Sequence, residues 1–132
     1  PVAVIADALN LLSNNWVDSN SYQPLNNRVA TTTTYNCAFI AGIKSSAGAQ
    51  YSGGLENYPR LQEKWGGITL NISGSFVELW NSQIATGNWP GTGTVYSAPI
   101  RNWAYDASFE SGTLPPFTPF AVEAIRGAWW EE

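Results

Sequence analysis

The sequence predicts a mainly β protein, either β-solenoid-like or a small β-sheet domain, with one short helix and long loops rich in Gly and Pro. Three observations support this fold class. Several segments are rich in β-branched and aromatic residues, three of them resemble one another, and the stretches between them favour turns. We predict a single β-rich domain over residues 1–132. Because the chain starts at Pro1 without Met, we interpret it as a processed or C-terminal fragment of a longer exported protein.

The three similar segments carry small and bulky residues at matching places. They are IADALNLLS from Ile5, YNCAFIAGI from Tyr35 and ISGSFVELW from Ile72. Their third to fifth residues run from small or short to bulky: Asp7-Ala8-Leu9, Cys37-Ala38-Phe39 and Gly74-Ser75-Phe76. Such a pattern indicates stacked β coils, with loops inserted because the spacings of 30 and 37 residues exceed a bare coil of roughly 20. The unequal spacing leaves chance similarity as the alternative.

The remaining elements follow from local signals. Val2–Ser13 is predicted as a strand in preference to a short helix, Asn14–Ala30 as a polar loop, and the run from Thr31 as a strand. After a flexible connection over Lys44–Gly54, the one predicted helix spans residues 56–65. Asn57 is its expected cap, Pro59 fits its first turn, Gly66 stops it, and Leu61 and Trp65 pack it against the sheet.

The C-terminal half is predicted to hold less regular structure. The run GITLNISGSFVELW is predicted to form two strands with a bend near Ser73-Gly74, or one bent strand. Gly and Pro make regular structure sparse over residues 85–119, and alternating apolar residues predict a last strand from Phe120.

Composition excludes several classes of function. Charged residues make up only 12 % of the chain and the net charge is −4, so no basic surface for nucleic acid is expected. No stretch approaches the roughly 20 apolar residues of a membrane span. The chain has no His, which excludes Ser-His-Asp and Cys-His catalysis and most transition-metal sites. No cofactor is expected, and calcium stays a minor alternative because Asp and Asn are plentiful in NNWVDSNS without the usual loop spacing. The single Cys37 is interpreted as a small buried residue, with an intermolecular disulfide as the alternative.

Four stretches resemble the C-terminal region of a family of large exported bacterial proteins, often described as hypothetical or pilus-assembly-related. They are PVAVIADALNLLSNNW, YSGGLENYPRLQEKW, GSFVELWNSQIATGNWPGTGTVYSAPIRNWAYD and LPPFTP. The resemblance covers most of the chain. It implies β-solenoid-like repeats upstream and an extracellular or cell-surface location in a bacterium, and it assigns no activity to the chain. Tyr58 stands where that family usually has Phe, and Phe117 where it usually has Gly, which puts the turn after the two prolines in doubt.

Two groups of residues are candidates for structural roles. Arg60, Arg101, Asp106 and Glu56 are predicted to form an ion-pair network that fixes the Gly/Pro-rich region to the sheet, because the planar guanidinium suits such pairing. For assembly, the candidates are Val2, Val4, Trp129 and Trp130 near the two chain ends.

The function predicted from these features is that of a non-enzymatic, extracellular structural subunit. We expect it to self-associate, with filaments as one form of the assembly and other surface or pilus-like proteins as further candidate partners. The first alternative is a carbohydrate-binding module with Trp89, Trp103 and Tyr105 as a sugar platform. The second is a small glycosidase that uses two carboxylates, although no local motif pairs two acids.

Overall fold

The computed structural model describes residues 1–41, 59–78, 94–116 and 118. This part of the chain is mainly β, as predicted, and holds no helix of seven or more residues. The elements in chain order are β1 (Ala3–Ile5), β2 (Asn10–Leu11), η1 (Asp18–Asn20), η2 (Leu25–Asn27), β3 (Thr33–Ala41), β4 (Arg60–Leu61), β5 (Thr69–Glu78), β6 (Ile100–Tyr105) and η4 (Ala107–Phe109).

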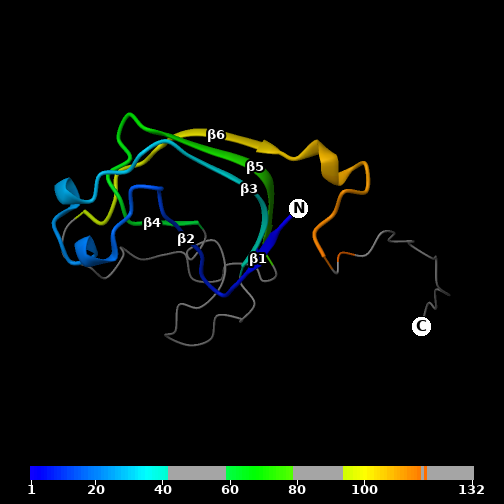
Figure 1. Ribbon diagram of the computed structural model, residues 1–132, viewed down its shortest axis with the longest axis horizontal. Helices are drawn as coiled ribbons and strands as arrows, with labels where there is room; N and C mark the ends of the chain where they lie inside the picture. Colours follow the sequence, from blue (N-terminus) through cyan, green and yellow to red (C-terminus); the bar gives the residue numbers. More distant parts are fainter. Residues whose placement is uncertain (42–58, 79–93, 117, 119–132) are drawn as a thin grey trace, which may run out of the picture.

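The main sheet consists of four parallel strands in the order β1-β3-β5-β6. Figure 1 shows β3, β5 and β6 following one another as nested arcs, with β6 at the outer margin. Each strand of the sheet lies beside the strand that comes one or two strands later in the chain. Because the neighbours are parallel, the chain must return to the same end of the sheet after every strand. These returns wind the chain in a β-solenoid-like path. Each full turn of this path is called a coil below.

Two smaller ladders lie along the return path. Strands β2 and β4 pair in parallel, and isolated parallel bridges join Val29 to Lys64 and Lys64 to Ser97. Val29, Lys64 and Ser97 come from three successive coils and therefore stack beside one another, as the strands of the main sheet do. Backbone hydrogen bonds link the layers, since Lys64 N donates to Arg28 O and Ser97 N donates to Glu63 O. A coil with pairing on several sides is the arrangement that the repeated segments predicted.

The predicted repeat is confirmed for its second and third copies. Cys37 pairs with Gly74, Ala38 with Ser75 and Phe39 with Phe76, as the aligned triplets require. The first copy was misaligned. Ala3, rather than residue Ala8, pairs with Ala38. Residues 6–9 instead form the connection between β1 and β2, so Val2–Ser13 contains two short strands in place of one.

The helix predicted for residues 56–65 is wrong over the described part, residues 59–65. Arg60 and Leu61 form β4, and Lys64 lies in a parallel bridge. Leu61, Glu63 and Trp65 are buried, whereas Lys64 between the last two is exposed. This alternation is that of extended backbone. Gly66 and Gly67 then form a turn in which Ile68 N donates to Trp65 O, and Gly67 has a φ of 76°, a conformation that favours glycine.

Other predicted elements have mixed outcomes. The polar loop over residues 14–30 is confirmed and contains two short 3-10 turns. The run from Thr69 forms one strand, β5. The region predicted to be sparse in regular structure contains β6 and η4. The connection over residues 44–54 and the last strand from Phe120 lie outside the described residues.

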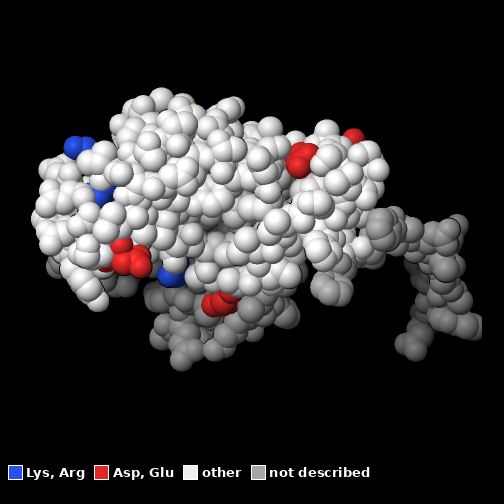
Figure 2. Space-filling model, in the orientation of Figure 1, with Lys and Arg blue, Asp and Glu red and all other residues white. Residues whose placement is uncertain are grey.

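The core lies on the inner face of the sheet, which points toward the β2–β4 ladder. It is apolar apart from a few residues and includes Leu9, Leu11, Ala30, Cys37, Phe39, Ala41, Leu61, Trp65, Leu70 and Ile72. Cys37 is buried, as predicted, and burial raises the pKa of its thiol. The charged side chains on the face drawn in Figure 2 are few and scattered.

Candidate functional site

The two edge strands of the main sheet are the first candidate site. Strand β1 covers only Ala38–Ile40 of β3, and β6 covers only Thr69–Gly74 of β5. Both edge strands are thus shorter than the central strands, which have nine and ten residues. Among the described residues, no strand pairs with the outer edge of β1 or β6. Such edges carry backbone donors and acceptors that are available to a further strand.

Aromatic side chains stack across the strands on the inner face. The rings of Phe39 and Phe76 are stacked with centroids 5.3 Å apart, and Phe76 lies 5.4 Å from Trp103. Arg101 places its guanidinium 5.1 Å from the centroid of Trp103. This row of aromatic rings therefore runs from the middle of the sheet to its β6 edge, where the ring of Trp103 is only partly buried. Stacked aromatic pairs stabilise neighbouring strands by about 0.5–1.5 kcal/mol beyond burial.

A polar ladder runs along the outer face of the same strands. Asn102 Nδ2 donates to Asn71 Oδ1 at 2.7 Å, and these residues are register partners. Thr34 is the register partner of Asn71 on the other side. Stacked side-chain amides of this kind satisfy one another along a parallel stack.

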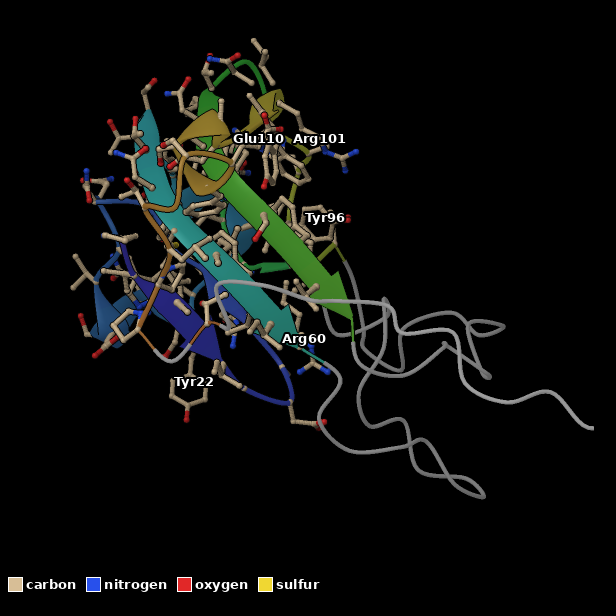
Figure 3. All side chains as sticks on the ribbon, turned by 90° about the vertical axis from the view of Figure 1, so that its right-hand side faces the viewer. Tyr22, Arg60, Tyr96, Arg101 and Glu110 are labelled. Carbon is tan, nitrogen blue, oxygen red and sulfur yellow. The ribbon has the colours of Figure 1, made fainter. Side chains whose placement is uncertain are left out.

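The residues of the predicted ion-pair network have separate contacts in the described part of the chain. Arg101 lies over Trp103, and the Asp106 carboxylate accepts from Ser108 N at 2.9 Å and caps η4. The hydrogen bonds from Ser108 lower the pKa of Asp106. Arg60 is in β4 and Arg101 is in β6, and Figure 3 shows the two side chains well apart. Glu56 lies outside the described residues. The network as a whole stays a prediction.

The predicted sugar platform is spread over different environments. Trp103 is half-buried between Phe76 and Arg101, whereas Tyr105 is 55 % exposed and contacts Phe109 edge-on. Trp89 lies outside the described residues. Trp103 and Tyr105 share the inner side of β6, and contacts to Phe76 and Arg101 leave less of the Trp103 ring for a sugar.

The predicted assembly residues at the N-terminus are accessible. Val2 and Val4 are 58 % and 38 % exposed, and the neighbouring Ile5 is 61 % exposed. Trp129 and Trp130 lie outside the described residues. The exposed side chains of β1 thus coincide with an edge of the sheet, which connects this part of the prediction with the candidate site.

A buried polar cluster near β2 and β4 was not predicted as a site. Glu63 is 1 % exposed, and its two carboxylate oxygens accept from Ser13 N and Ser13 Oγ, each at 2.6 Å. Nearby, Tyr35 OH donates to Leu12 O at 2.5 Å and accepts from Leu12 N at 3.0 Å. The signal in the sequence was the alternation of Leu61, Glu63 and Trp65, which places the carboxylate inward. The cluster ties the first coil of the chain to the second through the two bonds between Ser13 and Glu63.

Alkaline pH is expected to destabilise the fold through Tyr35. Burial raises the pKa of Tyr35 above its ordinary 10.0; the Leu12 hydrogen bond opposes this and Glu63 adds to it. The unfolded chain therefore loses this proton first, so the free energy of unfolding falls as the pH rises above about 10. Urea unfolding of the wild type and Tyr35→Phe over this range measures the effect. The Phe variant is expected to show a flatter decline, and parallel profiles for the two proteins would contradict the assignment.

Metal and membrane sites were also sought in the described part of the chain. It contains no group of three or more Asp, Glu, Cys or His side chains that is placed to hold a metal ion. Within the same residues, no helix has the length and apolar character needed to cross a membrane.

Comparison with known proteins gave no relative. No protein-family model, curated protein or solved structure matches this chain significantly. The candidate site therefore depends on the geometry of the edges alone.

Proposed function

We propose that this protein is a non-enzymatic structural subunit that self-associates into filaments through the edges of its parallel sheet. The observation that carries the proposal is the pair of outward edges on β1 and β6, which belong to opposite ends of one parallel stack. An edge without a partner in a parallel stack is a template for a further strand of the same direction.

The side chains at the two edges support the same proposal. Ile5 on β1 and Ile100 and Tyr105 on β6 are each more than half exposed. Apolar side chains beside open backbone edges favour burial by a neighbouring molecule. The chain carries few charges, 12 % of residues, so charge gives these edges little protection against pairing.

The proposed location is the outside of a bacterial cell, where surface or pilus-like proteins are further candidate partners. The support is the sequence resemblance to large exported bacterial proteins and the surface rich in Asn, Ser and Thr. Neither the location nor the additional partners is needed for self-association.

Electron microscopy together with sedimentation velocity tests self-association directly. We expect the purified chain to form oligomers whose size grows with protein concentration, with elongated particles in the images. A strictly monomeric species at the highest attainable concentration would contradict the proposed function.

A further inference from the structure

We propose that the chain cleaves its own peptide bond between Leu12 and Ser13, with the Ser13 hydroxyl as the nucleophile. The reaction happens once in each molecule and leaves residues 1–12 and 13–132 as two chains of one folded unit. It goes beyond the proposed self-association and does not depend on it.

Ser13 carries the nucleophile, and the carboxylate of Glu63 is the base beside it. Ser13 is 5 % exposed and Glu63 is 1 % exposed, so little water competes for the bond between them. Ser13 Oγ donates to Glu63 Oε1 at 2.6 Å, a length typical of charge-assisted hydrogen bonds. A base at this distance can take the hydroxyl proton as the oxygen attacks, which is how serine nucleophiles are activated. Asn15 N also donates to Ser13 Oγ, at 3.2 Å, and thereby stabilises negative charge that develops on this oxygen.

The carbonyl group that Ser13 attacks already accepts a strong hydrogen bond. Tyr35 OH donates to Leu12 O at 2.5 Å, and Leu12 N donates to the same hydroxyl at 3.0 Å. The phenol therefore polarises the carbonyl and is placed to stabilise the oxyanion that forms when the carbonyl carbon becomes tetrahedral. The bonds from Ser13 to Glu63 are sufficient to join the two coils, so the donor on Leu12 O is the feature that a purely structural role does not require.

The second oxygen of Glu63 faces the atom that must leave. Ser13 N donates to Glu63 Oε2 at 2.6 Å. This nitrogen becomes pyramidal in the tetrahedral intermediate, which allows its lone pair to turn toward the carboxyl group. The group that has just accepted the hydroxyl proton is therefore in position to deliver it to the leaving nitrogen. Glu63 acts first as general base toward Oγ and then as general acid toward N, and ends as a carboxylate again.

The bonds and protons balance over two steps. In the first, Ser13 Oγ forms a bond to the carbonyl carbon of Leu12, the bond from that carbon to Ser13 N breaks, and the hydroxyl proton passes through Glu63 to the nitrogen. The product is an ester that joins Leu12 to the Ser13 side chain. In the second step water cleaves the ester, which gives a Leu12 carboxylate and restores the hydroxyl. Leu12 is half-buried and Asn14 is exposed, so the ester lies at the margin of the core, where water can reach it.

The fold holds the two products together after cleavage. Strand β1 keeps its pairing with β3, β2 keeps its pairing with β4, and Leu9 and Leu11 stay in the core. The new α-ammonium group of Ser13 lies beside Glu63. In the described part of the chain, the bonds to this carboxylate come from Ser13 alone. A cation at this place offsets the cost of burying the carboxylate and so favours the cleaved form.

Mass spectrometry in denaturant tests the cleavage directly. We expect the wild-type chain to give two fragments that end at Leu12 and begin at Ser13, whereas the fragments elute together in gel filtration without denaturant. Hydroxylamine attacks esters much faster than amides, so it is expected to accelerate the reaction and to leave a hydroxamate on Leu12. A wild-type chain that stays whole after days with hydroxylamine, while circular dichroism shows it folded, would overturn the proposal.

Variants assign the roles, with the rate followed after cell-free synthesis and the fold of each variant checked by circular dichroism. Ser13→Ala is expected to stay whole, and Glu63→Gln to react about 10²-fold more slowly or less. Tyr35→Phe is expected to lose about 10²–10³-fold, as for removal of an oxyanion donor. Ser13→Cys keeps a nucleophile and is expected to cleave through a thioester. Ser73→Ala, the same chemical change on the outer face of β5, is the matched control and should cleave at the wild-type rate.

Two further outcomes would overturn the proposal. Cleavage of Ser13→Ala at the wild-type rate would show that the hydroxyl takes no part. Cleavage of the wild type in urea as fast as in buffer would show that the bond is broken without the folded arrangement of Glu63 and Tyr35. Full rates in both Glu63→Gln and Tyr35→Phe would remove the assigned base and the assigned oxyanion donor together. None of these results bears on self-association, which sedimentation velocity measures separately.

Discussion

Gly74→Ala is expected to lower the melting temperature by roughly 10 °C or more, because the added methyl group has no room. A Cβ at Gly74 would lie 1.9 Å from the carbonyl oxygen of Cys37 on the neighbouring strand. The obstacle is backbone, so no side-chain rotation relieves it, and β3 or β5 must shift. Figure 1 shows both strands turning near the place where β6 ends. A destabilisation of about 3 kcal/mol is expected from overpacking at such a corner.

Gly66→Ala is the matched control for this experiment. Its added Cβ would lie 3.5 Å from Ser97 Oγ, which is an ordinary contact, and its φ is outside the positive range. The same chemical change is therefore expected to alter the free energy of unfolding by less than about 1 kcal/mol. Thermal unfolding followed by circular dichroism compares the two variants. Equal melting temperatures for Gly74→Ala and Gly66→Ala would show that the sheet corner does not require glycine.

The pairing of β3 with β5 could be predicted because both strands carry matching residues at matching positions. The triplets Cys37–Phe39 and Gly74–Phe76 place small residues at the tight corner and Phe residues in the aromatic ladder. The packing of a parallel stack imposes this similarity on neighbouring coils. For β1 no such constraint was visible. It is an edge strand of three residues, and its register is set by backbone pairing at Ala38–Ile40.

The predicted helix failed because its signals were local. Asn57, Pro59 and Gly66 suit a helix start and stop, yet residues 61–65 are held extended by pairing with distant parts of the chain. Leu61, Glu63 and Trp65 are buried in alternation with more exposed residues. The sequence did not show this alternation as an apolar pattern, because one of the three buried residues is charged. A carboxylate in the core is unexpected from sequence, and only its partner Ser13, 50 residues away, explains it.

The edges that form the candidate site could be predicted only in part. Val2 and Val4 were named from their position near the chain end, and they lie beside the β1 edge. Strand β6 was missed because its inner face carries Arg101, Trp103 and Tyr105 in place of aliphatic residues. Those residues suit the outermost of the described strands on this side of the sheet, where burial is incomplete. The parts of the central strands that β1 and β6 cover depend on register, which no single segment encodes.

Glu63→Ala is expected to destabilise the fold by about 3 kcal/mol or more. The carboxylate is buried and accepts hydrogen bonds from both the backbone and the hydroxyl of Ser13. Its removal leaves two buried donors without acceptors and opens a cavity, and each unsatisfied donor costs about 1–3 kcal/mol. Since Ser13 follows β2 and Glu63 follows β4, the loss separates the first coil from the second. Urea unfolding of the purified variant measures the change.

The matched variants separate the hydrogen bonds from the volume of the side chain. Glu63→Gln keeps the size and one carbonyl acceptor for Ser13 N, and its amide can donate to Ser13 Oγ, so a loss of only about 1–2 kcal/mol is expected. Ser13→Ala removes the hydroxyl donor from the same pair. The double variant Ser13→Ala/Glu63→Ala is then expected to cost less than the sum of the single changes, because the second substitution removes a donor that the first had left unsatisfied. Strict additivity would mean that the bond from the Ser13 hydroxyl adds nothing to stability, so that Glu63 would act through its bond from Ser13 N and through packing.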